Sequence, residues 1–253
     1  MNTAPSNSTT VFLCGHGSSD PQSQAAFIDL VERFRRFSAF RVVAGTLEFS
    51  ERLLDEQLAV HVSKGNHLVL LPMFLAPGVH VEEDLRGALS RARSAFPEVS
   101  FFQTATLGEH EEMETLLAER VKPLLERSHT AVVLLAHGSR REEANLLVQE
   151  LADGVWEQLG GPLVTAAYWK VSPDLRQTLR ELSDQGIRHA VIVPFFLSEG
   201  SITERIDLEI ERLSAEFPKM HILRDKALGE DDRLLPLMQE LVLSALEPAF
   251  VVA

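Results

Sequence analysis

The sequence has little of the residues that mark secreted or membrane proteins. A single cysteine, Cys14, leaves no partner for an intrachain disulfide and is typical of a reducing compartment. No apolar run approaches the roughly 20 residues that a membrane-spanning helix needs. Residues 1–9 contain neither the basic nor the apolar segment of a secretory signal. We therefore expect a cytoplasmic protein that does not enter a membrane, with a flexible tail at 1–9.

Basic charge is also scarce. The chain has 24 lysines and arginines against 37 acidic residues, a formal net charge of −13. Because no basic run offsets this charge, we expect no nucleic-acid partner. An acidic small molecule is not excluded, since the field of the whole chain is screened beyond about 8–10 Å and local cations decide what binds in a cleft.

What the chain does contain is an internal repeat. VFLCGHGSS at 11–19 matches VVLLAHGSR at 132–140, and LVLLPMFLAPG at 68–78 matches AVIVPFFLSEG at 190–200. The step is 121 residues from His16 to His137 and 122 from Pro72 to Pro194. Because these landmarks keep their order and a nearly constant step, we expect two tandem domains, at 10–127 and 130–246.

Each repeat alternates short apolar runs with amphipathic stretches. In the first repeat we expect strands near 11–14, 41–45, 67–72 and 99–104, and helices near 21–38, 51–64, 82–96 and 110–126. Asp20-Pro21 is a typical helix start, and Phe96-Pro97 is a typical helix end. The alternation predicts an α/β fold, in which each repeat forms a four-stranded parallel sheet flanked by helices on both faces.

Three reactive side chains follow the first three expected strands of the first repeat. They are His16, Glu48 and His80. Ligands of parallel sheets bind beyond the carboxyl ends of the strands, so these side chains are expected to meet at one edge. Two imidazoles and one carboxylate suit a divalent first-row metal and leave a coordination position open.

The second repeat supplies an internal comparison. It keeps the first histidine as His137, but Lys170 and Ile202 stand where the carboxylate and the second histidine would be. Residues with a purely structural role would be expected in both copies. The loss of two of the three therefore favours a metal site in the first repeat alone, with the second site degenerate.

Structural explanations exist for each residue by itself. A histidine beside glycine after a strand is often a polar group near a helix start, and the recurrence of His16 as His137 fits that role. Glu48 could be a loop or capping carboxylate. His80 has no copy, which favours function. Their shared placement at strand ends favours the metal site for all three.

Together these motifs resemble a known family. The G-H-G-S opening, the L-E after the second strand and the P-x-F-L-x-x-G-x-H segment are similar to those of the sirohydrochlorin cobaltochelatases and ferrochelatases of the CbiX/SirB type. The resemblance covers nearly the whole chain, because long members of that family are tandem duplications. It implies two chelatase-like units with the active site in the cleft between them. Because Lys170 and Ile202 replace potential ligands in the second half, we expect one active site per chain.

The resemblance also implies an activity. It is the insertion, without ATP, of Co²⁺ or Fe²⁺ into sirohydrochlorin or a related tetrapyrrole, towards cobalamin or sirohaem. His16 and His80 would be the catalytic histidines and Glu48 the metal-site glutamate, with no cofactor beyond the metal substrate. Cationic residues should bind the carboxylates of the tetrapyrrole, and the candidates are Lys170, Arg140, Arg141 and Arg86. The assembly would be a monomer or a homodimer.

Other functions remain as alternatives. A metal or tetrapyrrole carrier without turnover would use the same three ligands. A histidine phosphatase would need an arginine directly before the histidine, where this chain has Gly15. No G-x-S-x-G elbow and no P-loop occur, so a serine hydrolase and nucleotide dependence are not indicated.

Overall fold

The computed structural model describes residues 9–76, 78–125, 128–140 and 142–250. The chain divides into two compact units, each of which is described by itself. The first is Met1–His110 together with Asp232–Ala253, and the second is Glu111–Asp231. Among the described residues, no helix is both long and apolar enough to cross a bilayer.

The first unit contains one parallel sheet of four strands in the order β2-β1-β3-β4. Its strands are β1 (Thr9–Gly15), β2 (Arg41–Thr46), β3 (His67–Pro72) and β4 (Ser100–Gln103). Its helices are α1 (Pro21–Phe37), α2 (Leu54–Ala59), α3 (Val79–Ala95), the 3₁₀ turn η1 (Leu107–Glu109) and α8 (Leu234–Phe250). The strand β1 is central and buried along its whole length, as expected of a strand covered on both faces.

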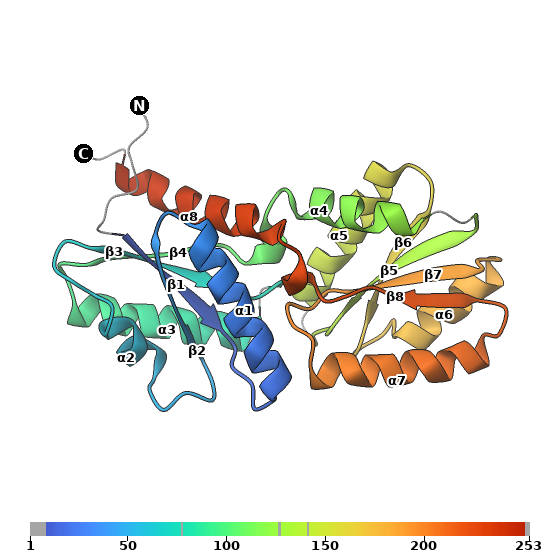
Figure 1. Ribbon diagram of the computed structural model, residues 1–253, viewed down its shortest axis with the longest axis horizontal. Coiled ribbons are helices and arrows are strands. Elements are labelled where there is room, and N and C mark those ends of the chain that lie inside the picture. The colour runs from blue at the N-terminus through green and yellow to red at the C-terminus, as the bar shows by residue number, and fades with distance from the viewer. Residues whose placement is uncertain (1–8, 77, 126–127, 141, 251–253) are drawn as a thin grey trace. The chain divides into compact units, whose positions relative to one another are not determined.

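Alternate residues of β1 point to the two faces of this sheet. Phe12 and Cys14 belong to a core cluster with Leu54 and Leu58 of α2 and Leu85 of α3. The opposite face is covered by α1 and α8, which Figure 1 shows in blue and red against this sheet.

The second unit repeats this design with the order β6-β5-β7-β8. Its strands are β5 (Thr130–Ala136), β6 (Leu163–Tyr168), β7 (His189–Pro194) and β8 (His221–Arg224). Its helices are α4 (Met113–Val121), α5 (Glu142–Leu159), α6 (Leu175–Asp184) and α7 (Ser201–Glu216), with the 3₁₀ turns η2 (Lys122–Leu124) and η3 (Leu228–Glu230). One face packs on α6 and α7, and α4 packs beside α5 (Figure 1).

The compact units differ from the sequence repeats in their last helices. The helix α4 ends the first repeat but packs in the second unit, and α8 ends the second repeat but packs on β3 and β4 of the first unit. Both helices bury an apolar face: Met113, Leu116, Leu117 and Val121 in α4, and Leu234, Met238, Val242 and Leu246 in α8. The boundaries expected at 10–127 and 130–246 therefore follow the repeats, whereas the chain crosses between compact units at 110–111 and again at 231–232.

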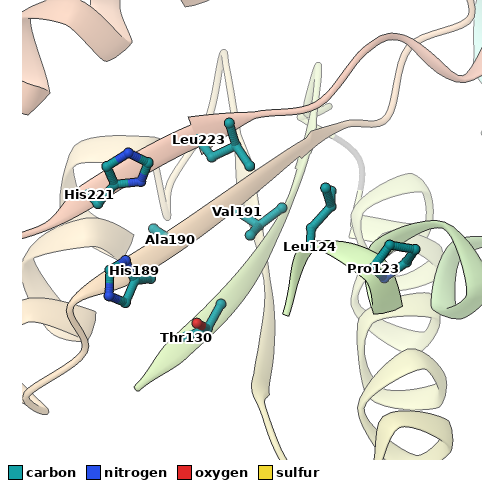
Figure 2. A pocket seen from close by; sticks show the side chains of 8 residues that line it. All are labelled: Pro123, Leu124, Thr130, His189, Ala190, Val191, His221 and Leu223. Atoms are coloured by element: carbon teal, nitrogen blue, oxygen red, sulfur yellow. The ribbon is translucent and has the colours of Figure 1, made fainter. Parts of the chain in front are cut away.

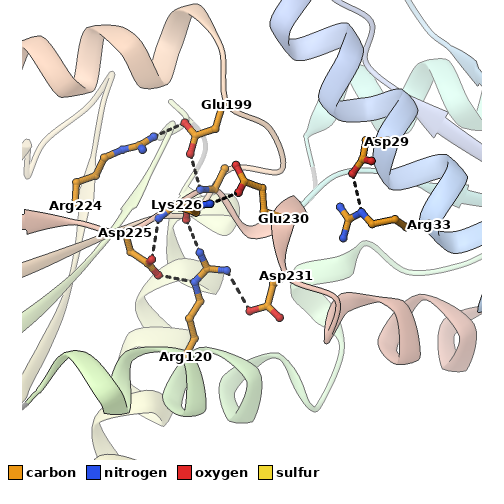
Figure 3. A network of polar contacts seen from close by, with 10 residues as sticks. Asp29, Arg33, Arg120, Glu199, Arg224, Asp225, Lys226, Glu230 and Asp231 are labelled. Carbon is orange, nitrogen blue, oxygen red and sulfur yellow. Dashed lines mark hydrogen bonds and ion pairs between the residues drawn. The ribbon is translucent and has the colours of Figure 1, made fainter.

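An arginine fixes α4 in its place. The side chain of Arg120 is 9% exposed and donates to Asp225 at 2.5 Å and to Asp231 at 3.2 Å. It also donates to the carbonyl of Lys226 at 2.7 Å. Figure 3 shows Arg120 reaching from α4 to the segment after β8. A guanidinium suits this role because its several N–H groups can bond different acceptors at once.

Most element positions agree with the sequence expectations. Asp20 caps α1 by accepting from the amide of Gln22 at 3.0 Å, and α3 ends one residue before Phe96. Three helices differ in length. The expected helix 51–64 is only Leu54–Ala59, and the chain turns at Gly65, where φ is +78°. The helix α3 begins three residues earlier than expected, and α4 gives way to a 3₁₀ turn that contains Pro123. Thr9, placed in the tail, is a buried residue of β1.

Candidate active site

His16 and Glu48 meet at the carboxyl edge of the first sheet. The chain runs from β1 outward to β2 and then returns to β3 on the other side of β1. Such a switch in strand order is where open parallel sheets bind ligands. The Nδ1 atom of His16 lies 3.8 Å from Oε2 of Glu48, and both side chains are more than half exposed. A metal bound about 2.0–2.2 Å from each atom would span this separation.

Backbone contacts hold this pair together. The amide of Glu48 donates to the carbonyl of His16 at 2.8 Å, and the Thr46 hydroxyl donates to the carbonyl of Glu48 at 2.8 Å. Gly17 has φ of +91°, and a Cβ atom there would lie 2.1 Å from the Glu48 carbonyl oxygen. Only glycine allows this approach, so the G-H-G sequence brings the two loops together.

Two further residues support the edge. Gln57 of α2 accepts from the Thr46 amide at 3.1 Å and donates to the Thr46 carbonyl at 2.8 Å, which fixes the end of β2. Phe74, just after β3, packs edge-on against the His16 ring with 6.3 Å between ring centroids. Loops from all three strands of the switch therefore contribute to the same site.

The third expected ligand is placed only by its backbone. His80 is the second residue of α3, directly beyond the edge at which β3 ends. Its side chain lies outside the described part of the structure. Among the described side chains, no group of three or more histidines, cysteines or acidic residues is close enough to hold a metal. The three-ligand set therefore stays a prediction, and the described geometry brings together two of its members.

The second unit has the same backbone without these ligands. The amide of Lys170 donates to the carbonyl of His137 at 2.9 Å, as that of Glu48 does to His16. Ile202 is the second residue of α7, as His80 is of α3. The Nδ1 atom of His137 lies 3.0 Å from the carbonyl oxygen of Gly138. Residues that align in the sequence at steps of 121 and 122 thus occupy equivalent backbone positions in the two units.

The expected tetrapyrrole-binding cations are spread over both units. Lys170 and Arg140 are exposed at the carboxyl edge of the second sheet. Arg141 lies outside the described residues. Arg86 is exposed on α3 but lies six residues beyond His80, about 9 Å along the helix, which places it away from the strand ends.

Cys14 takes no part in the edge. It is fully buried in β1, within the core cluster under α2 and α3. Burial raises the pKa of its thiol to about 12, so the thiol stays protonated at neutral pH. Cys14 is therefore a buried thiol that packs with the apolar core.

The second unit also has a small pocket, at the opposite, amino edge of its sheet. It has a volume of about 220 Å³ and is lined by Leu124 after α4 and by residues of β5, β7 and β8 (Figure 2). His189 and His221 face each other there with 5.9 Å between ring centroids. No candidate site residue lines this pocket.

Sequence reasoning missed Gln57 and Phe74 as residues of the site. Phe74 lay within the quoted P-x-F-L segment, and its place two residues after the end of β3 was the available signal. Nothing in the sequence pointed to Gln57, because its contact with Thr46, 11 residues away in the chain, depends on how α2 packs against the end of β2.

Two known proteins with sequences similar to this chain are named as sirohydrochlorin chelatases, one for cobalt and one for iron. A sirohydrochlorin cobaltochelatase of Priestia megaterium is 23% identical over 245 residues, which cover 94% of this chain and 80% of that protein. A sirohydrochlorin ferrochelatase of Bacillus subtilis is 24% identical over 217 residues, covering 84% and 83%.

Solved structures show the same fold. SirB from Bacillus subtilis, described with Fe³⁺, superposes with a TM-score of 0.80 at 21% identity, covering 94% of this chain and 95% of that one. A CbiX structure, described as the terminal enzyme of sirohaem biosynthesis in denitrifying bacteria, gives 0.64 at 16% identity, covering 94% and 99%. The CbiX family model matches twice, at residues 10–124 and 131–245. This chain therefore belongs to the CbiX family, as a tandem duplication of the family's unit.

Proposed function

We propose that this protein inserts a divalent metal, Co²⁺ or Fe²⁺, into sirohydrochlorin or a closely related tetrapyrrole without using ATP. The observation that carries the proposal is the pairing of His16 with Glu48 at the switch point of the first sheet, in a chain whose two halves both match the CbiX family. The relatives named for cobalt and iron insertion support the choice of these metals. The single cysteine, which is typical of a reducing compartment, supports a cytoplasmic location for this reaction.

Metal insertion exchanges two protons for one ion. The tetrapyrrole loses the protons of two pyrrole N–H groups, and the metal forms bonds to the ring nitrogens as it leaves its former ligands. An imidazole can hold the ion and can also accept a proton near neutral pH. His16 is exposed and in reach of Glu48, so it can do either.

Glu48 complements the histidine. Its carboxylate lies 3.8 Å from the ring and can balance the charge of the incoming metal. Its main chain is fixed by Thr46 and by the close approach of Gly17, so little ordering is needed when the metal arrives. We assign His80 the second imidazole, since α3 begins at this edge.

The test is anaerobic incubation of the purified protein with sirohydrochlorin and Co²⁺ or Fe²⁺, followed by absorbance. We expect insertion well above the protein-free rate. His16→Ala and His80→Ala should each lower kcat at least about 100-fold, the usual size of a lost acid–base or ligand group. His137→Ala, at the equivalent position of the second unit, is the matched control and should stay within about 3-fold of wild type.

Two outcomes would contradict this assignment. A rate equal to the protein-free rate, together with tight binding of metal or tetrapyrrole, would make the protein a carrier. Equal losses in His16→Ala and His137→Ala would mean that the histidine has a structural role common to both units.

A further inference from the structure

Phe49, the residue after Glu48, has an unusual conformation. Its φ is +57°, in the left-handed region that non-glycine residues rarely occupy. Its side chain is also 66% exposed, although a phenyl ring is ordinarily buried. Backbone strain of this kind persists only where the surroundings enforce it and is concentrated at functional sites, so an exposed aromatic ring on such a residue, next to Glu48, calls for an explanation.

The conformation follows from the contacts that position Glu48. The carbonyl of Glu48 accepts from the Thr46 hydroxyl and lies against Gly17, while its amide bonds His16. The amide and the carbonyl of Glu48 are thus both held, and the chain turns at the next residue. Phe49 makes that turn and directs its ring to solvent at the edge where His16 lies.

The second unit shows that the fold does not require this arrangement. Val171 is the counterpart of Phe49, one residue after Lys170. It has no positive φ and is only partly exposed. Its side chain packs towards Gly138, where a Cβ atom would lie 2.8 Å from the Val171 Cγ2 atom. The exposed aromatic ring and the left-handed turn occur only in the copy that has the His16–Glu48 pair.

We propose that Phe49 binds the substrate, contacting the flat conjugated ring of the tetrapyrrole beside the metal held by His16 and Glu48. This inference rests on the proposed function. A conjugated macrocycle offers an apolar face on which a phenyl ring can stack, edge-on or offset. The macrocycle's acidic side groups need cations, but its face needs an apolar partner at the metal site. Phe49 fits that need through its exposed ring and its position next to Glu48.

The experiment measures sirohydrochlorin binding by fluorescence titration without metal, and steady-state insertion with Co²⁺, for three variants. Phe49→Ala should raise Kd and KM about 3- to 10-fold, the range of an aromatic contact, with kcat reduced less than KM is raised. Phe49→Tyr keeps the ring and should restore both values to near wild type. Phe37→Ala is the matched control, because Phe37 is also an exposed phenylalanine but ends α1 at the opposite edge of the sheet.

Unchanged Kd and KM in Phe49→Ala, with wild-type insertion intact, would overturn the inference and leave the proposed function standing. An equal rise in Phe37→Ala would also overturn it, since the effect would then be one of general surface hydrophobicity. Absence of both binding and insertion in the wild type would remove the proposed function and this inference with it. Thermal unfolding of each variant distinguishes lost binding from lost fold.

Discussion

At the residue scale, the site depends on the absence of a side chain. Gly17→Ala places a Cβ atom 2.1 Å from the Glu48 carbonyl, at a φ of +91°. Gly65→Ala is the matched control, since Gly65 has φ of +78° and nothing within 4 Å of the added atom. We expect Gly65→Ala to cost about 1–2 kcal/mol from its left-handed backbone alone. Gly17→Ala should cost more and should also weaken Co²⁺ binding.

Chemical denaturation and calorimetric titration with Co²⁺ measure these two effects. Equal losses of stability in the two variants, with wild-type Co²⁺ affinity in both, would show that the Gly17–Glu48 approach does not shape the site.

Lys170 provides a second prediction at this scale. It is exposed at the carboxyl edge of the second sheet, in the position that Glu48 has in the first. If it binds a substrate carboxylate, Lys170→Glu should raise KM for sirohydrochlorin about 30-fold and change kcat little, because a surface charge pair contributes about 1 kcal/mol and its reversal roughly doubles the effect. Lys219→Glu makes the same charge change in the turn before β8 and should leave KM unchanged. Steady-state kinetics measure these KM values. Equal KM values for Lys170→Glu and wild type would show that Lys170 does not bind a substrate carboxylate.

Two residues of the candidate site could be predicted from the sequence, but the geometry of the site could not. His16 and Glu48 were predictable because strand ends in a parallel sheet share one edge. The left-handed backbone of Phe49 was not, since it follows a residue whose amide and carbonyl are held by contacts with His16, Thr46 and Gly17 that only the folded chain makes. The role of Gln57 required knowledge of how α2 packs on β2.

At the scale of elements, Arg120 determines how α4 is held. Arg120→Met keeps most of the volume but removes the bonds to Asp225 and Asp231, which are 20% and 10% exposed. Because two largely buried carboxylates lose this partner, we expect a loss of about 3 kcal/mol in the free energy of unfolding. Arg176→Met is the control, since Arg176 is half exposed where it meets Glu209 and Glu216 and should cost at most about 1 kcal/mol. Urea unfolding measures both; similar small losses would mean that apolar packing alone holds α4.

A pH dependence follows from the loop after β7. Burial raises the pKa of Glu199, but hydrogen bonds from Arg224, the Ala227 amide and Thr203 outweigh it, and the net effect lowers the pKa below its ordinary value of 4.5. A lowered folded-state pKa stabilises the fold at pH values above the unfolded pKa. This contribution is lost as the pH falls through the folded pKa.

Glu199→Gln should therefore lower the melting temperature at pH 7, and the difference from wild type should shrink as the pH falls below about 4. Glu230→Gln is the control, because its partner Lys226 is largely exposed and a surface pair contributes little. Melting curves from pH 7 to 3 provide the measurement. A difference that stays constant with pH would show that the Glu199 charge does not stabilise the loop.

The elements themselves were largely predictable, and their partners were not. Apolar periodicity and the Asp20-Pro21 start located the strands and helices, because these signals are local. The sequence does not show that α4 packs in the second unit and α8 in the first. Both helices have an apolar face in the sequence, but that face does not indicate which sheet it covers. The choice depends on contacts such as Arg120 with Asp225, which are distant in sequence.

At the scale of the molecule, the exchange makes the first unit depend on the end of the chain. A chain that stops at Asp231 lacks α8 and its buried apolar side chains, which in the part of the helix whose burial is described are Leu234, Leu235, Leu237, Met238, Leu241, Val242 and Leu246. At about 1.5–3 kcal/mol each, their loss is comparable with the whole stability of a domain. We expect the first unit to lose its fold and the second to keep it.

Hydrogen exchange followed by mass spectrometry tests this expectation. Amides of β1 and β3 should exchange rapidly in the truncated chain, and those of β5 and β7 should stay protected. A chain lacking only residues 251–253 is the control and should match the full chain. Protection of β1 in the chain that stops at Asp231 would show that α8 is dispensable.

The chain passes from the first unit to the second and later returns to the first. This path also determines the order in which the two units of a newly synthesised chain can fold. Synthesis runs from the N-terminus, and domains generally fold in that order. Here the second unit, Glu111–Asp231, is contiguous and is complete once Asp231 has been added. The first unit must wait for α8, about 1–4 seconds more at typical rates of translation. The unit with His16 and Glu48 is thus begun first and finished last, and synthesis that stops before α8 leaves a chain in which the unit that carries this pair is incomplete.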